Sequence, residues 1–392
     1  MPLQLSHDEA RRFLATYHFT PTDIAGVFAH LGTVQYDPLN PVGRNPDLVL
    51  QARVAGYQVD DWQKAAYTER IIYDAWDKQA CLVPVSDWPN RARVRSTRQA
   101  WSPIDMEREA EAVAATLAEL DARGPLSSLD FEDQSHFVGR GEWFGPKRVK
   151  HILQVLWIRG VIVTHHRKHG RHYYDRAERV IPAEHFNAPP LLEEEAYYRW
   201  VVARRAQSMG LMRLSGDASI WTQSGTAAQR KVALEQALEA GTLTPAQIGE
   251  KRWVAYLPTG ALPLLEQPVP APRVIFLGPL DSLLWDRKTV QYVFDYDYIW
   301  EVYKPEKDRR WGYYVLPVFY GDRFIGRVDS RLEKGIWKIS RWWWEPDVTP
   351  TAELLEALRS GAEAFCRYLH ATGVQVAEGV DPATRQALAG SL

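Results

Sequence analysis

The sequence is poor in cysteine and has no long apolar run. Cys81 and Cys366 are the only cysteines among 392 residues, so neither a disulfide framework nor a cysteine-rich zinc site is expected, and a reducing compartment fits. No stretch of about 18 apolar residues is present, which argues against a transmembrane helix. The N-terminal stretch MPLQLSHDEARRF is polar and lacks the apolar segment of a signal peptide. We therefore expect a cytoplasmic protein with no membrane partner.

A large excess of charge of one sign is also missing. The chain has 47 Lys and Arg against 49 Asp and Glu, a net charge of −2, which excludes a uniformly basic nucleic-acid-binding protein. It has no Gly-rich phosphate loop and no His and Cys at metal-ligand spacing, so we expect no cofactor and no metal site. The balance is locally uneven, because residues 139–179 hold ten Lys and Arg against three Asp and Glu.

Helix and strand signals divide the chain into several units, as expected for 392 residues with 46% hydrophobic and 24% charged content. The first three units each have helical segments followed by an extended stretch or hairpin, a pattern typical of winged helices. The helical segments are 6–17, 20–31, 46–54, 106–122, 146–159, 192–209 and 226–240, and the extended segments are 80–85, 161–182 and 241–257. No exact sequence repeat accompanies this pattern.

The last third of the chain changes character, because aromatic and β-branched residues replace the helical pattern. Strands are expected at 298–303, 312–320, 323–331 and 335–343, with a closing amphipathic helix at 350–371. The sequence thus predicts an α+β protein with three tandem winged-helix units followed by a small C-terminal β-barrel-like domain. The predicted units are residues 1–100, 101–188, 189–260 and 261–392.

The basic segment coincides with the helix and hairpin of the second predicted unit. Basic residues crowd the first turns of the helix and the turn of the hairpin, as in modules that grip DNA phosphates. The candidate DNA-binding residues are Lys147, Arg148, Lys150, Arg167, Lys168 and Arg171. A solvated charged face is the alternative. The tract His165, His166, His169 and His172 could bind a metal ion instead, but its basic setting favours phosphate contact.

A short polar motif lies near the N-terminus, in HLGTVQYDPLNPVGRN (30–45). Thr33 to Asp37 alternate like a brief strand, which would place Gln35 and Asp37 on one side and Tyr36 on the other. A Pro-Asn-Pro turn follows at once. Taken alone, the two polar residues could simply face solvent on an edge strand.

Four longer runs give the motif a context. They are YYDRAERVIP (173–182), FLGPLDSLLWDR (276–287), FDYDYIWEVYKP (294–305) and WGYYVLPVFYGDRFIGRVD (311–329). These runs resemble motifs of the AlkZ/YcaQ-type winged-helix DNA glycosylases, a bacterial family that unhooks alkylated bases. The resemblance covers nearly the whole chain. The family's motif of Gln, an apolar or aromatic residue, and Gln or Asp falls on Gln35-Tyr36-Asp37, which implies the branch that acts on interstrand crosslinks and N7-alkylguanine.

The resemblance implies a function and a set of site residues. We expect a monofunctional glycosylase, with Asp37 as general base and stabiliser of the sugar cation and Gln35 orienting water. Arg44 and Asn45, beyond the turn, are candidate DNA contacts, and a solvated loop is their alternative. The implied partner is double-stranded DNA with alkylated or crosslinked bases, bound by a monomer at the nucleoid. The family often has a His near residue 78, where this chain has Lys78.

Two other functions are compatible with the pattern. The first is a non-catalytic winged-helix DNA-binding protein or transcription regulator, since a fold does not fix a function. No ligand-binding domain is evident to support it. The second is an interaction scaffold that uses the aromatic C-terminal region.

Overall fold

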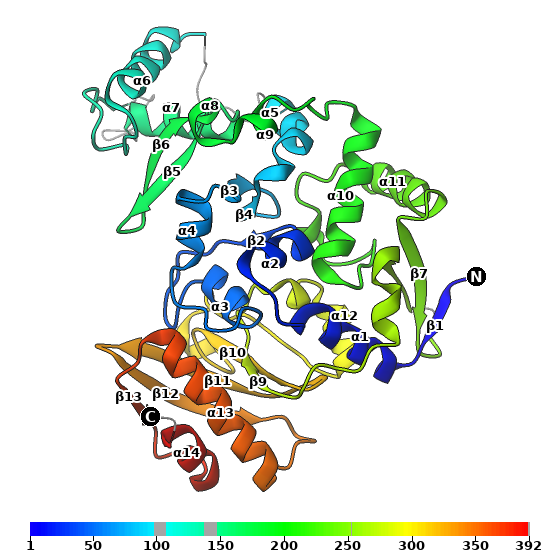
Figure 1. The fold of residues 1–392 in the computed structure, drawn as a ribbon. Coiled ribbons are helices and arrows are strands. Elements are labelled where there is room, and N and C mark those ends of the chain that lie inside the picture. The colour runs from blue at the N-terminus through cyan, green and yellow to red at the C-terminus, as the bar shows by residue number, and fades with distance from the viewer. Residues whose placement is uncertain (98–106, 137–146, 252, 391–392) are drawn as a thin grey trace. The chain divides into compact units, whose positions relative to one another are not determined.

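The computed structural model describes residues 1–97, 107–136, 147–251 and 253–390 (Figure 1). Helices and sheets are both abundant, so the mixed α+β class is confirmed. The chain forms two compact units, one of Met1–Trp62 with Val201–Leu392 and one of Gln63–Trp200. This grouping does not test the four predicted units or the number of winged helices, which remain predictions.

The first unit combines the N-terminal helices with the C-terminal half of the chain. Its early elements are β1 (Leu3–Leu5), α1 (His7–Phe19), α2 (Ile24–Leu31), β2 (Val34–Gln35) and α3 (Asn45–Gln51). Its later elements are α10 (Glu194–Met209, begun in the second unit), η4 (Ala218–Trp221), α11 (Ala227–Glu239), β7 (Leu243–Ile248), β8 (Trp253–Pro258), η5 (Thr259–Leu265), β9 (Val274–Phe276), η6 (Ser282–Leu284), α12 (Arg287–Phe294), η7 (Glu306–Asp308), β10 (Val315–Tyr320), β11 (Arg323–Glu333), β12 (Ile336–Trp344), α13 (Ala352–Leu369), β13 (Gly373–Val376) and α14 (Pro382–Ala389).

The start of α1 follows from the capping box in the sequence. Ser6 accepts a hydrogen bond from the Glu9 N–H, and the Glu9 carboxylate accepts one from the Ser6 N–H. The Asp23 carboxylate caps α2 by accepting a hydrogen bond from the Gly26 N–H at 2.7 Å, and Gly32 ends the helix with a left-handed φ of 71°. The predicted hairpin at 241–257 is present as β7 and β8, and β1 adds to it in parallel beside β7. No turn or alternation signal in the sequence had indicated that third strand.

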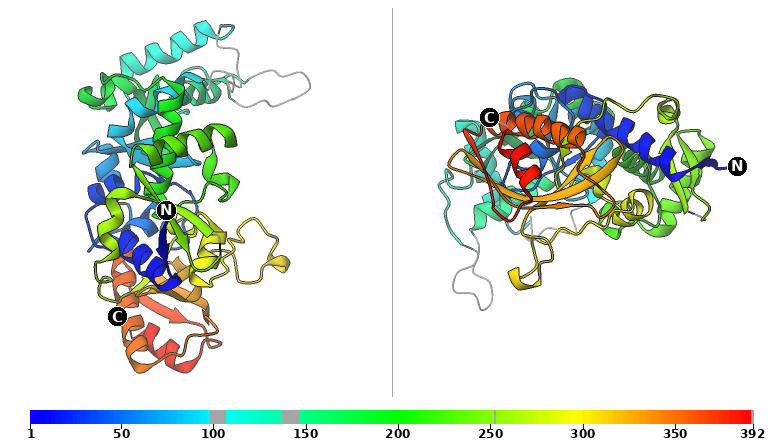
Figure 2. Two further views of the ribbon diagram at one scale, coloured as in Figure 1. Left: turned by 90° about the vertical axis from the view of Figure 1, so that its right-hand side faces the viewer. Right: turned by 90° about the horizontal axis from the view of Figure 1, so that it is seen from below.

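The C-terminal region is an open sheet. Its five strands lie in the order β13-β12-β11-β10-β9, so β13 and β9 are its edges among the residues that the structure describes. The predicted β-barrel-like closure is not seen there. Helix α13, which matches the predicted closing helix, crosses one face of this sheet in both views (Figures 1 and 2).

One predicted strand is wrong. Residues 298–303 form no strand, and their burial does not alternate, because Glu301 and Val302 are both buried while Tyr303 is exposed. The buried Glu301 carboxylate explains the difference, because it accepts hydrogen bonds from the backbone N–H groups of Arg310 and Trp311 at 3.1 and 2.7 Å. These bonds close a loop around η7 that projects from the first unit in Figure 2.

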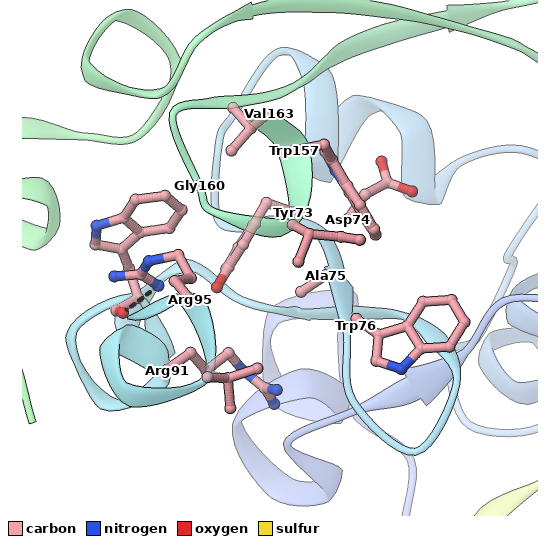
Figure 3. A pocket seen from close by; sticks show the side chains of 12 residues that line it. Tyr73, Asp74, Ala75, Trp76, Arg91, Arg95, Trp157, Gly160 and Val163 are labelled. Carbon is pink, nitrogen blue, oxygen red and sulfur yellow. Dashed lines mark hydrogen bonds between the residues drawn. The ribbon is translucent and has the colours of Figure 1, made fainter. Parts of the chain in front are cut away.

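The second unit holds the basic segment. Its elements are α4 (Trp62–Tyr67, begun in the first unit), β3 (Ile72–Trp76), β4 (Ala80–Pro84), η1 (Val85–Asp87), η2 (Pro89–Arg91), α5 (Ala92–Thr97), α6 (Ala110–Arg123), α7 (Arg148–Ile158), β5 (Ile162–Lys168), β6 (Arg171–Arg176), α8 (Ala177–Val180) and α9 (Ala183–Phe186). Strands β5 and β6 form the predicted hairpin. A cavity of about 40 Å³ lies beside Tyr73, Trp88 and Arg95 (Figure 3). It has room for roughly one water molecule and none for a nucleobase.

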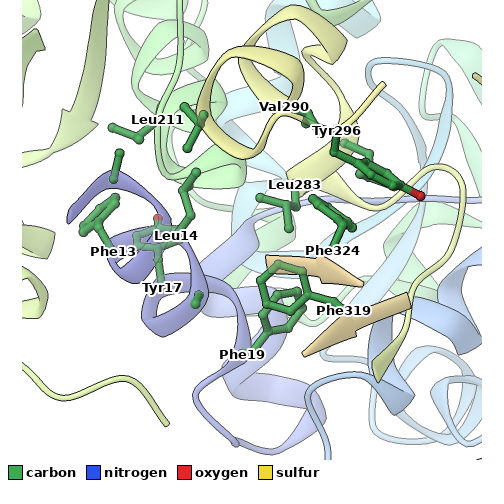
Figure 4. Close-up of a cluster of buried hydrophobic side chains, with 14 of the residues drawn as sticks. Phe13, Leu14, Tyr17, Phe19, Leu211, Leu283, Val290, Tyr296, Phe319 and Phe324 are labelled. Atoms are coloured by element: carbon green, nitrogen blue, oxygen red, sulfur yellow. The ribbon is translucent and has the colours of Figure 1, made fainter. Parts of the chain in front are cut away.

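A buried cluster explains why residues 1–62 belong with the C-terminal half. Phe13 and Phe19 of α1 lie in the same cluster as Phe319 and Phe324 of the C-terminal sheet (Figure 4). The Phe19 and Phe319 rings are 5.0 Å apart. Aromatic burial on this scale is a main source of folding free energy, so the N-terminal helices fold against strands that follow about 300 residues later in the sequence.

Candidate functional site

The Gln35–Asp37 segment lies where α2 has ended and the chain passes through β2. The strand has only two residues, so it ends at Gln35, and Asp37 lies beyond it. The expected alternation therefore reaches Gln35 but not Asp37, and the common facing of the two side chains stays a prediction. Gln35 is buried, with 8% of its surface exposed, and the Tyr36 ring meets the Trp62 ring edge-on at 5.9 Å.

Asp37 is a half-buried carboxylate in a tight local turn. Its Oδ1 accepts a hydrogen bond from the Leu39 N–H at 2.9 Å, as the residue before a proline-initiated turn often does. Burial raises the pKa of Asp37 above its ordinary value, and the bond from Leu39 opposes that rise. A carboxylate with a raised pKa is a stronger base than one in water, which suits proton abstraction.

Tyr314 is a neighbour of Asp37 that residue type and spacing did not single out. Burial, and after it the negative charge of Asp37, raises the pKa of Tyr314 well above its ordinary value. The tyrosine belongs to the run WGYYVLP, directly before β10. The likeness of that run to a family motif was the available signal for a role near the site.

Asn45 is wholly buried at the start of α3. Its side-chain N–H donates to the Gln35 carbonyl at 2.7 Å, and its Oδ1 accepts from the Leu280 N–H at 3.2 Å. A Cβ at Gly278 would lie 2.7 Å from that Oδ1, so only glycine allows this approach. Asn45 therefore braces the motif strand against the GPLD run, and it has no exposed side chain for the direct DNA contact expected from the sequence.

Arg44 and Asp47 form a second polar group beside the motif. Arg44 pairs with Asp60 at 3.0 Å and keeps 20% of its side chain exposed, so a DNA contact by Arg44 stays a prediction. Asp47 is buried and accepts hydrogen bonds from Tyr57 Oη, Asp60 N–H and Arg44 N–H. Burial raises the pKa of Asp47 to about 6. Sequence reasoning missed this carboxyl group, which lies two residues beyond the predicted DNA contacts.

The C-terminal runs hold the polypeptide that follows Asp37. The Leu332 N–H donates to the Pro41 carbonyl at 2.7 Å, and Tyr368 Oη donates to the Val42 carbonyl at 3.0 Å. After α3, Arg53 makes a bidentate ion pair with Asp281 of the GPLD run at 2.8 and 2.9 Å. Burial acts to raise the pKa of the Asp281 carboxyl, yet the Arg53 guanidinium holds it below its ordinary value. Segments of the C-terminal half, the GPLD run among them, thus position the motif loop.

The basic segment of the second unit is partly neutralised by carboxylates of the same unit. Arg167 donates to the Asp74 carboxylate and to Tyr67 Oη, with 7% of its side chain exposed. β5 turns this side chain inward onto β3, and the phosphate contact expected of Arg167 stays a prediction. Arg176 and Arg179 pair with Asp121 at 2.9 and 2.7 Å.

The start of α7 has basic residues with protein partners and a basic residue that is exposed. Arg148 pairs with Glu109, and Lys147 donates to the Gln134 amide oxygen at 2.5 Å, so both have protein partners. Lys150, Lys168 and Arg171 are exposed and remain the candidate phosphate contacts. The His tract packs on the hairpin itself, where His166 stacks on Tyr173 at 4.6 Å.

The remaining features considered in the sequence are Lys78, metal-ligand clusters and membrane-spanning helices. Lys78 is buried in the turn between β3 and β4. In the part of the chain that the structure describes, no three His, Cys, Asp or Glu side chains gather as metal ligands would. No described helix is both long and apolar enough to cross a membrane.

Comparison with known proteins bears on the geometry around Gln35 and Asp37. The family model "DNA glycosylase AlkZ-like" matches residues 28–368, which include the motif and the runs that position it. The chain belongs to the AlkZ-like DNA glycosylase family. Its structure is similar to that of the Streptomyces sahachiroi DNA glycosylase AlkZ, with a TM-score of 0.64 and 14% identity over 95% of this chain and 99% of that one. This AlkZ-like protein therefore shares the fold of that enzyme across nearly its full length.

Proposed function

We propose that this AlkZ-like glycosylase hydrolyses the N-glycosidic bond of N7-alkylated purines in duplex DNA, including purines joined in interstrand crosslinks. Asp37 is the general base and the stabiliser of the positive sugar, and Gln35 orients the attacking water. The observation that carries the proposal is a half-buried carboxylate of raised pKa, two residues beyond a buried and braced glutamine. The chain that carries this carboxylate belongs to a family of DNA glycosylases.

The reaction needs little more than a base and a fixed water. As the C1′–N9 bond breaks, its electron pair leaves with the purine, and positive charge develops at C1′. Water attacks C1′ and gives a proton to Asp37, while the Gln35 amide offers both a donor and an acceptor to hold that water. The negative carboxylate also stabilises the developing charge.

One carboxylate suffices because the leaving group is already activated. An N7-alkylated purine carries a positive charge, so it departs as a neutral base without protonation by a general acid. Ordinary glycosidases need two carboxyl groups because their leaving oxygen must be protonated. The residues Gln35-Tyr36-Asp37 include no lysine that could form a Schiff base with the sugar, which favours hydrolysis without strand cleavage.

The substrate is held in part by exposed cations. Lys150, Lys168 and Arg171 are the residues proposed to contact phosphates, with Arg44 nearer the motif. Such contacts give affinity that falls with salt. The predicted monomeric state and location at the nucleoid belong to the same proposal.

Base release tests the proposal directly. Wild type and Asp37→Asn are incubated with duplex DNA carrying N7-methylguanine and with an N7-linked crosslink, and duplex binding is measured in parallel. We expect Asp37→Asn to slow release by roughly 10²- to 10⁴-fold, as for loss of a general base, while the Kd for duplex changes less than about twofold.

The matched control is Asp347→Asn, which makes the same change at an exposed carboxylate. Release at the wild-type rate by Asp37→Asn would remove Asp37 from the mechanism. Intact binding with no release by the wild type from either substrate would favour a DNA-binding protein without catalysis.

A further inference from the structure

A ladder of four planar groups in contact lies in the first unit, on elements that do not carry the motif. The Arg213 guanidinium lies 3.8 Å from the Trp253 ring centroid. The Trp253 and Tyr292 rings stack at 4.2 Å with 20° between their planes, and the His7 ring lies 4.7 Å from Tyr292, tilted by 59°. His7 begins α1, Trp253 begins β8 and Tyr292 belongs to α12. Three separate elements thus contribute to one stack.

The ladder is fixed by close backbone contacts. Tyr292 Oη donates to the Ile248 carbonyl at 2.9 Å. Gly249 has a φ of 63°, and a Cβ there would lie 2.6 Å from His7 Cε1 and 2.9 Å from Tyr292 Oη. Only glycine tolerates both that conformation and that approach. The rings are therefore held in place before any ligand arrives.

The ladder forms a wall of an open groove of about 1040 Å³. Lys251 and Lys288 are exposed at this groove, and Arg11 also lines it, against the two carboxylates Glu250 and Asp295. The Lys251 ammonium is 5.9 Å from the Tyr292 ring centroid. Trp253 also lines a second hollow of about 470 Å³ together with Arg213 and Arg230. Aromatic rings and cations alternate along the surface.

We propose that this groove binds an unpaired DNA strand, with a base packed against the His7 end of the ladder and phosphates near Lys251 and Lys288. Proteins that bind single strands without sequence preference combine the same two features, an aromatic platform and a cationic track. The small excess of positive charge limits the phosphate contribution, so stacking has to supply much of the affinity. A strand of this kind is present at a gap or a forked end beside a damaged duplex.

Binding of a fluorescent oligothymidylate of ten nucleotides, followed by anisotropy, tests the proposal. Lys251→Glu with Lys288→Glu should weaken binding at least tenfold and make it less dependent on salt. His7→Ala removes the last ring of the ladder and should weaken binding about five- to tenfold, in the range of one base–aromatic stacking interaction. The matched control, Lys231→Glu with Lys334→Glu, reverses two exposed charges elsewhere in the same unit and should bind as the wild type does.

Three results would overturn the proposal. The first is that the wild type does not bind the oligothymidylate. The second is that the control pair weakens binding as much as Lys251→Glu with Lys288→Glu does. The third is that inorganic polyphosphate competes with the oligothymidylate, and that His7→Ala changes neither this competition nor the affinity for DNA. Base release from a short, fully paired duplex should be the same in Lys251→Glu/Lys288→Glu as in wild type. The groove and the proposed catalytic role of Asp37 can therefore fail independently.

Discussion

Buried polar contacts have opposite consequences in the motif loop around Gln35 and Asp37 and in the basic hairpin of β5 and β6. Around Gln35 and Asp37, buried partners such as Asn45 and the Arg53–Asp281 pair fix the backbone, while the Asp37 carboxylate stays half-exposed. In the hairpin, buried partners consume the charges themselves, as Asp74 does for Arg167. Polar burial therefore fixes the backbone around the proposed base in the first region and pairs a candidate DNA contact internally in the second.

The difference shows which charged side chains of this protein are available to bind a ligand. An ion pair in the interior is held by its partner and is not free for a ligand, whereas an exposed lysine next to it remains available. Of the six basic residues at the helix start and hairpin, three have internal partners and three are exposed. Local net charge thus overstates the surface available to DNA.

The largest expected effect distinguishes the buried, paired Arg167 from the exposed Lys168 and Arg171 of the same hairpin. Arg167→Gln leaves the Asp74 carboxylate, 4% exposed, without its ionic partner, and should lower the free energy of unfolding by about 3–5 kcal/mol. Lys168→Glu with Arg171→Glu should leave unfolding within about 0.5 kcal/mol of wild type. It should nevertheless weaken duplex binding roughly tenfold and reduce the salt slope by about 0.9 for each phosphate that is no longer neutralised.

Urea unfolding and a salt titration of duplex affinity measure these two quantities. If Arg167→Gln changed the salt slope as much as the exposed pair did, the internal pairing of Arg167 would not describe the protein in solution. An unchanged salt slope in Lys168→Glu/Arg171→Glu would remove the hairpin from the DNA-binding surface.

The sequence predicted local elements well where the signal was local. The capping box at Ser6 and Glu9 set the start of α1, and the basic turn at Lys168 separated the two strands of the hairpin. The sequence could not place Phe19 against Phe319, because no periodicity links residues 300 positions apart. The segment at Tyr298 was wrongly predicted as a strand, since its aromatic and β-branched residues belong to a loop that the buried Glu301 carboxylate closes.

The candidate site was predicted in part for the same reason. Gln35 and Asp37 were singled out by their spacing together with the family resemblance, whereas the nearness of Tyr314 to Asp37 and the burial of Asp47 appear only in the folded chain. Asn45 was singled out as a candidate DNA contact, whereas its burial and its bond to the Gln35 carbonyl give it a bracing role. Burial and partner choice are tertiary properties, and single-sequence reasoning does not reach them.

The next effect tests the bracing of the motif. Asn45→Ala removes the bond to the Gln35 carbonyl and leaves the Leu280 N–H without its acceptor, so the free energy of unfolding should fall by about 1–3 kcal/mol. Base release should fall about tenfold or more at unchanged duplex Kd, because Gln35 is no longer held. Gln51→Ala is the matched control, since it deletes a side-chain bond from the same helix to the Phe276 carbonyl at 2.6 Å. Equal loss of base release in both variants would reduce Asn45 to a purely structural residue.

The smallest effect is a change in the shape of the pH profile. Burial raises the pKa of Asp37 above the ordinary 3.8, so protonation of the base, and with it the loss of base release, should begin at a higher pH than for an exposed aspartate. Base release is measured across the acidic range at saturating substrate, after subtraction of spontaneous release. A profile with no acid limb above pH 4 would contradict the assignment of Asp37 as the base.

The pKa of Asp47 is raised as well, and a variant of Asp47 separates the two carboxyl groups. Its pKa is raised to about 6, so the folded protein binds that proton more tightly than the unfolded chain does. The free energy of unfolding should therefore rise as the pH falls from about 6 towards 3.8, the reverse of the loss expected in base release. Asp47→Asn should abolish this rise while leaving an acid limb of base release that belongs to Asp37. If Asp47→Asn removed the limb as well, the titrating group in the reaction would be Asp47, and the motif carboxylate would act only through its charge.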